Sequence, residues 1–292
     1  ANSIKAVVLS FMDRGIEMTG LNFTILSEIP ADAGLGTPNA LKVATAMALR
    51  KVFAPRLTKA DLVDILENAN VQHLKTYPHR ADILCALYAK AGNHRRKTAD
   101  IYPFPINNYR IILTDSRVPR LLAREELNHR IQECMEAYER VKKMPDIPPD
   151  FSKLAESDLE ELAIPESVRR RVLYIIRESI SVDDAIAALK KNDWVVFSRI
   201  VTRSQENLRD RFEISCPELD WLVKRAMEFV APDMNDIVCS RLTGRGFGGC
   251  TYSILRANDI QTYIEKLGDY ERIFGFKPLY YKVKPSGGVR IL

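Results

Sequence analysis

A glycine-rich loop near the C-terminal end constrains the fold of this sequence more than any other feature. Residues 244–249 read GRGFGG, with apolar, strand-forming residues on both sides, at Ile237–Leu242 and Thr251–Leu255. Glycine tolerates positive φ and lets the backbone approach another group closely. We therefore expect a strand, a tight loop and a second strand, with the loop lying against a ligand or a neighbouring loop.

A second glycine-bearing loop lies near the beginning of the chain. Residues 30–38 read PADAGLGTP; the alternating segment Leu21–Ile29 precedes them and a helical pattern over Asn39–Lys51 follows. The expected order is strand, glycine loop, helix. An ordinary helix start would use similar residues, with Thr37 as N-cap and Pro38 at the first helical position.

The remaining segments mix both kinds of secondary structure. Leu57–Leu74 has a helical pattern with Thr58 as its expected N-cap, and Ala123–Lys143 predicts a long charged helix. Strands are expected at Tyr109–Thr114 and Leu279–Val283. We therefore predict an α+β protein with two lobes, residues 1–115 and 116–292.

Composition narrows the class of protein. Of the 292 residues 46% are apolar and 28% charged, as in soluble globular proteins, and no apolar run is long enough to cross a bilayer. The five scattered cysteines lack a CxxC pair, which fits reduced thiols in a cytoplasmic protein. The net charge of +5 is spread along the chain without the basic, aromatic-containing stripe of a nucleic-acid binder. We therefore expect neither a membrane nor a nucleic acid as partner.

Three segments resemble one family. Residues 236–251 (DIVCSRLTGRGFGGCT) resemble the C-terminal glycine signature of galactokinases, which belong to the GHMP superfamily of small-molecule kinases. Residues 208–220 resemble the family's RDxFExSxPELD stretch, and residues 284–288 its C-terminal end. The resemblance runs in order from about Ser3 to Gly288. It implies the GHMP kinase fold, with ATP and a sugar meeting in a cleft between two lobes.

The loop at residues 30–41 stands where the family has its phosphate loop, PxGxGLSSSAxL. Backbone N–H groups at such a helix start bind phosphate. The resemblance thus implies ATP binding by Gly34, Leu35, Gly36, Thr37 and Asn39, and sugar binding by Gly244 and Gly246. It also implies Mg²⁺, with Thr37 and Asn70 as the expected ligands.

Asp82 is the expected catalytic residue. It lies in PHRADIL, which aligns with the family's CGIMDQ segment. In such kinases a carboxylate orients or deprotonates the attacking sugar hydroxyl, so the resemblance makes Asp82 both catalytic and substrate-binding. Taken alone, one aspartate before a helix is more often an N-cap.

Several positions depart from the family pattern. Pro38 replaces a serine that helps hold the metal, and Asn70 replaces a glutamate near it, although Glu67 lies one helical turn away. Leu127 stands where a tyrosine normally packs near the sugar. The opening motif GRxNLIGEHxDY does not occur in these residues, and we therefore expect them to be part of a longer protein.

Two functions follow from this pattern. The first is a phosphotransferase of carbohydrate metabolism that phosphorylates galactose or a related sugar at the anomeric hydroxyl, with Mg²⁺ on the phosphates and Asp82 as base. The second is a catalytically silent, galactokinase-like protein that binds sugar or nucleotide and regulates a partner, which the three changed positions favour. A third reading, a structural remnant without a ligand, is weaker.

Overall fold

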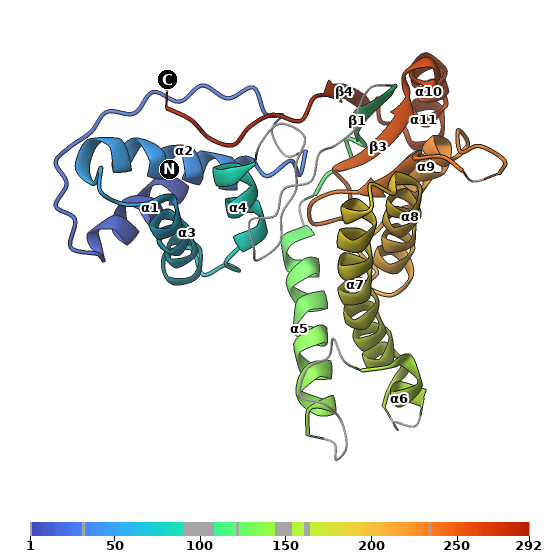
Figure 1. Cartoon of the computed structure of the whole chain (residues 1–292), viewed down its shortest axis with the longest axis horizontal. Coiled ribbons are helices and arrows are strands. Elements are labelled where there is room, and N and C mark those ends of the chain that lie inside the picture. Colours follow the sequence, from blue (N-terminus) through green and yellow to red (C-terminus); the bar gives the residue numbers. More distant parts are fainter. Residues whose placement is uncertain are drawn as a thin grey trace. The chain divides into compact units, whose positions relative to one another are not determined.

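The computed structural model describes residues 2–30, 33–89, 108–120, 123–143, 154–160, 164–233 and 235–291 (Figure 1). The chain divides into two compact units. Unit 1 comprises Ala1–Ala31, Leu35–Pro105 and Pro285–Leu292, and unit 2 comprises Asp32–Gly34 and Ile106–Lys284.

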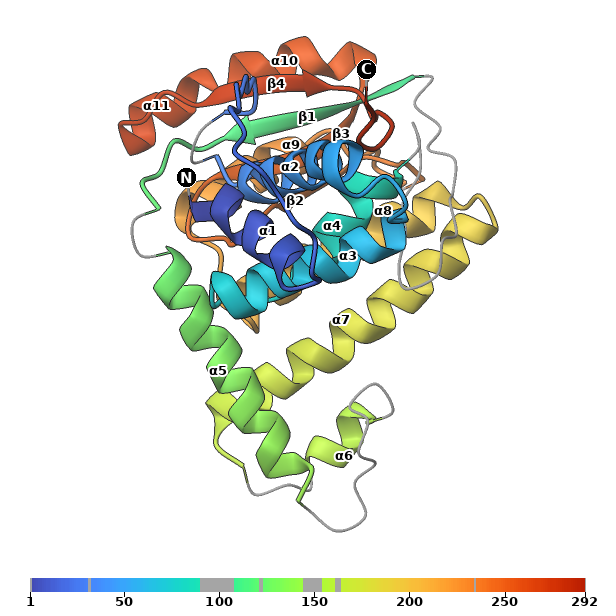
Figure 2. The ribbon, with the colours of Figure 1, turned by 90° about the vertical axis from the view of Figure 1, so that its left-hand side faces the viewer.

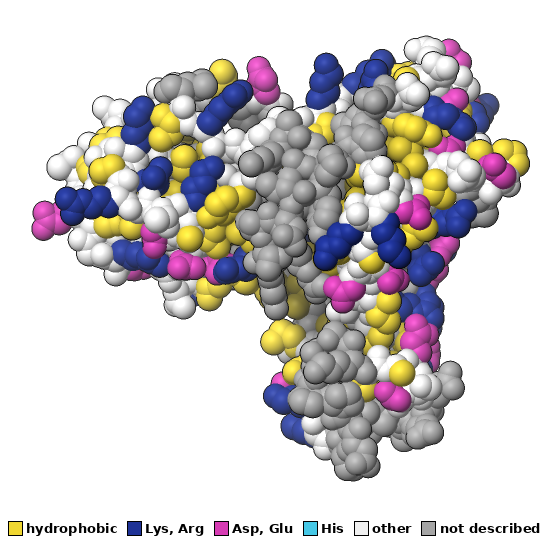
Figure 3. All heavy atoms as spheres, in the orientation of Figure 1, with side chains coloured by type: hydrophobic (Ala, Val, Ile, Leu, Met, Phe, Trp, Pro, Cys, Tyr) yellow, Lys and Arg dark blue, Asp and Glu magenta, His cyan; other side chains and the backbone are white. Residues whose placement is uncertain are grey.

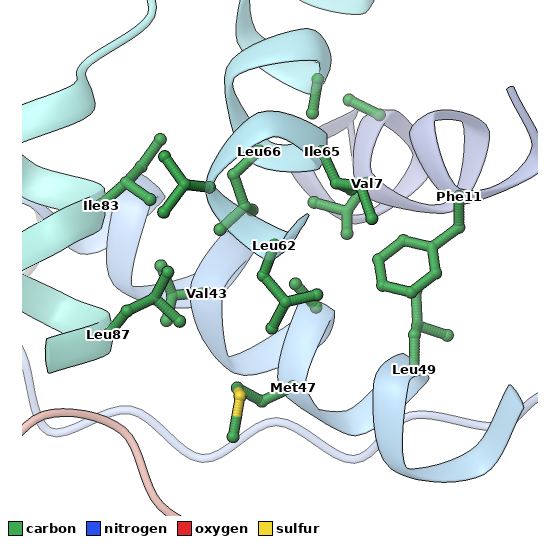
Figure 4. Packing of buried hydrophobic residues seen from close by; sticks show 14 residues of the cluster. Val7, Phe11, Val43, Met47, Leu49, Leu62, Ile65, Leu66, Ile83 and Leu87 are labelled. Carbon is green, nitrogen blue, oxygen red and sulfur yellow. The ribbon is translucent and has the colours of Figure 1, made fainter. Parts of the chain in front are cut away.

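The regular elements of unit 1 are all helices in the part that the structure describes. Its elements are α1 (Asn2–Met12), α2 (Thr37–Phe53), α3 (Lys59–Asn68), the π-helix η1 (Ala69–His73) and α4 (Arg80–Tyr88). Their apolar faces meet in one core, in which α1 contributes Val7 and Phe11, and α4 contributes Ile83 and Leu87 (Figure 4). Each large apolar side chain buried in this way contributes roughly 1.5–3 kcal/mol to stability.

Local capping decides where the helices of unit 1 begin. Thr58 caps α3 as expected, in a reciprocal capping box with Asp61. The expectation of Thr37 as the N-cap of α2 is wrong. Gly36 is the N-cap, in the left-handed conformation at φ 78°, and Thr37 is already helical. Glycine takes this conformation at little cost, which shifts the helix start by one residue.

The strand expected at Leu21–Ile29 does not form. The segment has no regular structure, and Leu26 is 91% exposed. A strand needs a neighbour for its backbone hydrogen bonds, and every strand of the described residues lies in unit 2. The sequence of this segment alternates, but the described residues of unit 1 contain no strand with which it could pair.

The C-terminal segment belongs to unit 1. The backbone N–H of Val289 donates to the Ala86 carbonyl of α4 over 2.7 Å, and Gly288 N–H donates to the Ala89 carbonyl. A Cβ at Gly288 would lie 2.9 Å from the Ala86 oxygen. The last residues therefore lie directly against the end of α4.

Unit 2 is built on a four-stranded antiparallel sheet, in the order β2-β3-β1-β4 (Figure 2). The strands are β1 (Tyr109–Asp115), β2 (Cys239–Leu242), β3 (Cys250–Arg256) and β4 (Leu279–Val283). Ile112 of β1 faces Ser253 on one side and Lys282 on the other. The four strands expected here from the sequence are confirmed within two residues.

Helices cover this sheet and extend from it. They are α5 (Ala123–Val141), α6 (Glu156–Glu160), α7 (Glu166–Lys190), α8 (Trp194–Asp210), α9 (Pro217–Met227), the 3-10 helix η3 (Ala257–Asp259), α10 (Ile260–Lys266) and α11 (Gly268–Phe274). Tyr263 and Tyr270 of α10 and α11 are fully buried against Ile112 and Leu255 of the sheet. Away from the sheet, α5 packs along α7 (Figure 1).

The two units do not divide where the sequence suggested. The expected boundary at residues 115 and 116 placed β1 in the first lobe, but β1 pairs with β3 and β4 of unit 2. All seven residues of β1 therefore belong to unit 2, and the division falls between residues 105 and 106. The return of residues 285–292 to unit 1 was not expected either.

Candidate functional site

A row of buried polar side chains follows one face of α2. Asn39 and Lys42, three residues apart and therefore on the same side of the helix, are 8% and 3% exposed. Buried polar groups are normally hydrogen-bonded, because leaving one without a partner costs free energy. The partners of these two side chains come from α4 and η1.

Asn39 holds the expected catalytic carboxylate. Its Nδ2 donates to Asp82 Oδ2 over 2.7 Å. Asp82 lies in the first turn of α4, where the N-cap is His79, so the alternative of Asp82 as an N-cap is excluded. His79 Nδ1 is 3.9 Å from Asp82 Oδ2. The Asp82 side chain is 58% exposed, so it is accessible to a substrate. The hydrogen bond from the buried Asn39 side chain holds it in position.

The other polar atom of Asn39 has no hydrogen-bond partner among the described residues. This Oδ1 is buried. An amide oxygen in that situation accepts a hydrogen bond from any hydroxyl or water that reaches it. Asn39 therefore offers an acceptor beside the Asp82 carboxylate.

Lys42 is held by Asn70, which is fully buried in η1. Lys42 Nζ donates to Asn70 Oδ1, and Asn70 Nδ2 donates to the Pro78 carbonyl over 2.8 Å. The Asn70 carbonyl accepts the Thr76 N–H over 2.9 Å. Single π-turns of this kind recur at functional sites. Asn70 thus joins the lysine of α2 to the segment that leads into α4.

Asn70, expected to bind Mg²⁺ together with Thr37, fits that role poorly. The amide oxygen is the only metal-ligating atom that Asn70 could offer, and the Lys42 ammonium group contacts it. Glu67, the alternative, is paired with Arg80 at 2.7 Å. Throughout the described ranges no three His, Cys, Asp or Glu side chains come together as a metal site.

The C-terminal glycine loop is packed against protein in unit 2. A Cβ at Gly244 would lie 2.7 Å from the Gly34 oxygen, and one at Gly246 would lie 2.0 Å from the Ile214 oxygen. Arg120 Nε donates to the Gly246 carbonyl over 3.3 Å. Gly34, from the first glycine loop, and Gly244, 210 residues later, are therefore in direct contact.

Several candidate residues are thus brought together and others are not. Asn39, Asn70 and Asp82 form one cluster in unit 1, at the helix that starts with Thr37. Gly34, Gly244 and Gly246 lie together in unit 2. Leu35 and Gly36 belong to unit 1 and connect Gly34 to that helix.

Leu127, at the position of a family tyrosine, lies among the apolar side chains around Leu208 and Phe212. It is partly buried and packs against this cluster. Sequence reasoning missed Lys42, His79 and Arg120. Lys42 could have been found from its spacing of three residues from Asn39 on a helix, and His79 from its spacing of three residues from Asp82. Arg120 depends on long-range packing.

Comparisons with known proteins agree with this architecture. The protein family described as "GHMP kinases N terminal domain" matches residues 2–90 of this chain, and the family described as "GHMP kinases C terminal" matches residues 185–270. The chain is 61% identical to the "Putative galactokinase" of Treponema pallidum, over all of this chain and 75% of the relative. It belongs to the galactokinase family of the GHMP kinases.

More distant members of the galactokinase family show the same relation. The galactokinase of Thermotoga maritima is 29% identical over 98% of this chain and 80% of its own length. The crystal structure of Lactococcus lactis galactokinase with galactose superimposes with a TM-score of 0.84 at 20% identity, covering 98% of this chain and 75% of that one. The chain therefore has the GHMP kinase fold.

The charge distribution on the surface and the character of the helices are relevant to nucleic-acid and membrane partners. Figure 3 shows Lys and Arg side chains scattered among acidic and apolar ones over the face drawn. Among the helices that the structure describes, none combines the length and the apolar character needed to cross a membrane.

Proposed function

We propose that this protein catalyses the ATP-dependent phosphorylation of galactose, or of a closely related sugar, at the anomeric hydroxyl. The observation that carries the proposal is the Asn39–Asp82 pair: an accessible carboxylate held by a buried amide over 2.7 Å, in a chain of the galactokinase family. Phosphoryl transfer needs mainly positioning, charge stabilisation and a carboxylate beside the attacking hydroxyl.

Each group has a role in this proposal. Asp82 orients the sugar hydroxyl and takes its proton, and Asn39 holds the Asp82 carboxylate in place through its Nδ2. The start of α2, with Leu35, Gly36 and Thr37, receives the ATP phosphates, because the N–H groups of a helix start favour anions. Gly34, Gly244 and Gly246 would contribute loop backbone to nucleotide and sugar.

Magnesium enters the proposal only as the counterion that ATP brings. Thr37 offers a single hydroxyl and the Asn70 oxygen is in contact with Lys42, so we assign no reaction step to an ion held by these two residues. We place the protein in the cytoplasm on the ground that its five cysteines are all free thiols. Its partners would be small molecules, without nucleic acid or membrane.

The galactokinase relatives favour the kinase over a catalytically silent binder. The deciding experiment measures ADP release by the full-length protein with Mg·ATP, with and without galactose. Release that requires galactose and disappears in Asp82→Asn supports the proposal. A thermal shift with galactose and ATP but no ADP above the sugar-free rate would leave the silent binder instead.

A further inference from the structure

The inference concerns the buried lysine of α2 and rests on the proposed use of ATP. Lys42 is 3% exposed in the second turn of the helix. Lysine is among the residues least often fully buried, because its charge loses hydration. A lysine in this place therefore has a specific electrostatic role or a specific partner.

The contact with Asn70 indicates which position the Lys42 ammonium group occupies. Its Nζ contacts Asn70 Oδ1, the oxygen expected to face a metal ion. A divalent ion on the same oxygen would lie about 2.1 Å from it. Two positive centres would then be within a few ångströms of each other in a poorly hydrated interior, where their repulsion is strong.

The surroundings keep Asn70 in this arrangement. Its Nδ2 is used by the Pro78 carbonyl at 2.8 Å, so the amide cannot turn without losing that hydrogen bond. One helical turn before Lys42, Asn39 donates to Asp82. The ammonium group thus lies one helical turn from the pair that holds the proposed base, near the positive end of α2.

We propose that the Lys42 ammonium group takes the place of a divalent ion held by the protein. The nucleotide phosphates are then attracted by a fixed internal charge and by the start of α2. Any Mg²⁺ travels with the nucleotide and is not ligated by Asn70. This makes Lys42 a phosphate-attracting residue that acts through the field of its charge.

The test measures nucleotide affinity and does not need turnover. A fluorescent ADP analogue is titrated into the full-length wild type in Mg²⁺ and in EDTA. The expected dissociation constants differ by less than about fivefold between the two conditions. A larger loss of affinity in EDTA would overturn the inference, and this arm requires no variant.

Lys42→Met gives the second arm, with Lys51→Met as its matched control, because Lys51 is an exposed lysine of the same helix. In EDTA we expect Lys42→Met to weaken nucleotide binding by about fivefold or more, and Lys51→Met to leave it unchanged. Melting temperature checks that both variants fold. A folded Lys42→Met protein that binds like the wild type contradicts the role of Lys42.

The outcomes also separate this inference from the proposed function. Galactose-dependent ADP release together with a strict Mg²⁺ requirement for nucleotide binding keeps the kinase and removes the Lys42 role. Absence of nucleotide binding in both conditions removes both.

Discussion

Asn39 Nδ2 lies 2.7 Å from Asp82 Oδ2, although the two residues are 43 positions apart in the chain. The contact joins the start of α2 to the first turn of α4. A buried amide beneath an exposed carboxylate limits the directions in which that carboxylate can point, and positioning of this kind is what phosphoryl transfer requires.

The first prediction concerns Asp82 itself. Asp82→Asn keeps an oxygen that can accept the Asn39 hydrogen bond but cannot take a proton, so galactose-dependent ADP release should fall by about a hundredfold or more. Asp64→Asn, at an exposed carboxylate of α3, is the control and should keep full activity. Melting temperatures of both variants should match the wild type. An Asp82→Asn protein with near-normal turnover would exclude Asp82 as the base.

The second prediction distinguishes a role of Asn39 in positioning Asp82 from a role in the stability of the fold. Asn39→Ala removes the hydrogen bond to Asp82 and should lower kcat about tenfold, with KM for ATP unchanged. Its free energy of unfolding should change by less than about 1 kcal/mol, because the lost hydrogen bond is offset by removal of a buried oxygen that has no partner among the described residues. Steady-state kinetics and urea unfolding test this. Unchanged kcat would show that the amide does not position the carboxylate.

The third prediction compares two glycines with the same backbone conformation. Gly246 and Gly275 have φ of 72° and 75°, but an added Cβ would lie 2.0 Å from the Ile214 oxygen at Gly246 and meets nothing within 4 Å at Gly275. Gly275→Ala should cost about 1 kcal/mol of unfolding free energy.

Gly246→Ala should cost about 3 kcal/mol, because the loop must also move away from Ile214. Urea unfolding of the two variants gives the difference directly. Equal losses would mean that the tight contact of the glycine loop is absent in solution.

The fourth prediction is a pH dependence at Asp220. Burial raises the pKa of this carboxyl above its ordinary value of 3.8, against the lowering effect of its hydrogen bond from Ser215. A raised pKa means that folding favours the protonated form. The stabilising contribution is therefore complete below pH 3.8 and is lost as the pH rises through the folded-state pKa.

Asp220→Asn should consequently stabilise the protein at pH 7.5, and this gain should shrink toward pH 4. Asparagine can still accept the 2.6 Å hydrogen bond from Ser215 Oγ. Unfolding at the two pH values, with Asp184→Asn on an exposed face of α7 as control, measures the effect. A variant less stable than the wild type at pH 7.5 would contradict the prediction.

Much of unit 2 could be predicted from local pattern. The strands on either side of the glycine loop have apolar runs bounded by glycines, and β4 matches its predicted limits because its pattern and its pairing agree. Leu21–Ile29 has an equally clear alternation, yet no strand forms, because strand formation depends on a partner that the pattern itself does not contain.

The site was predictable only in part. Asp82 was found through motif resemblance, and its accessibility agrees with a base. Lys42 was missed because a lysine on a helix is usually solvated, and its burial depends on Asn70, 28 residues away. The metal expectation for Asn70 rested on its position in the family pattern, which does not contain the lysine side chain that contacts its oxygen.

The return of the C-terminal segment to α4 has a consequence for biosynthesis. Residues 106–284 interrupt unit 1 in the chain, so the ribosome must complete unit 2 before Gly288 and Val289 can reach the carbonyls at the end of α4. Domains generally fold in the order of their synthesis. Here α4 is synthesised before unit 2 but receives the hydrogen bonds from Gly288 and Val289 only after it, and until then the end of α4 remains open to other contacts in the cell.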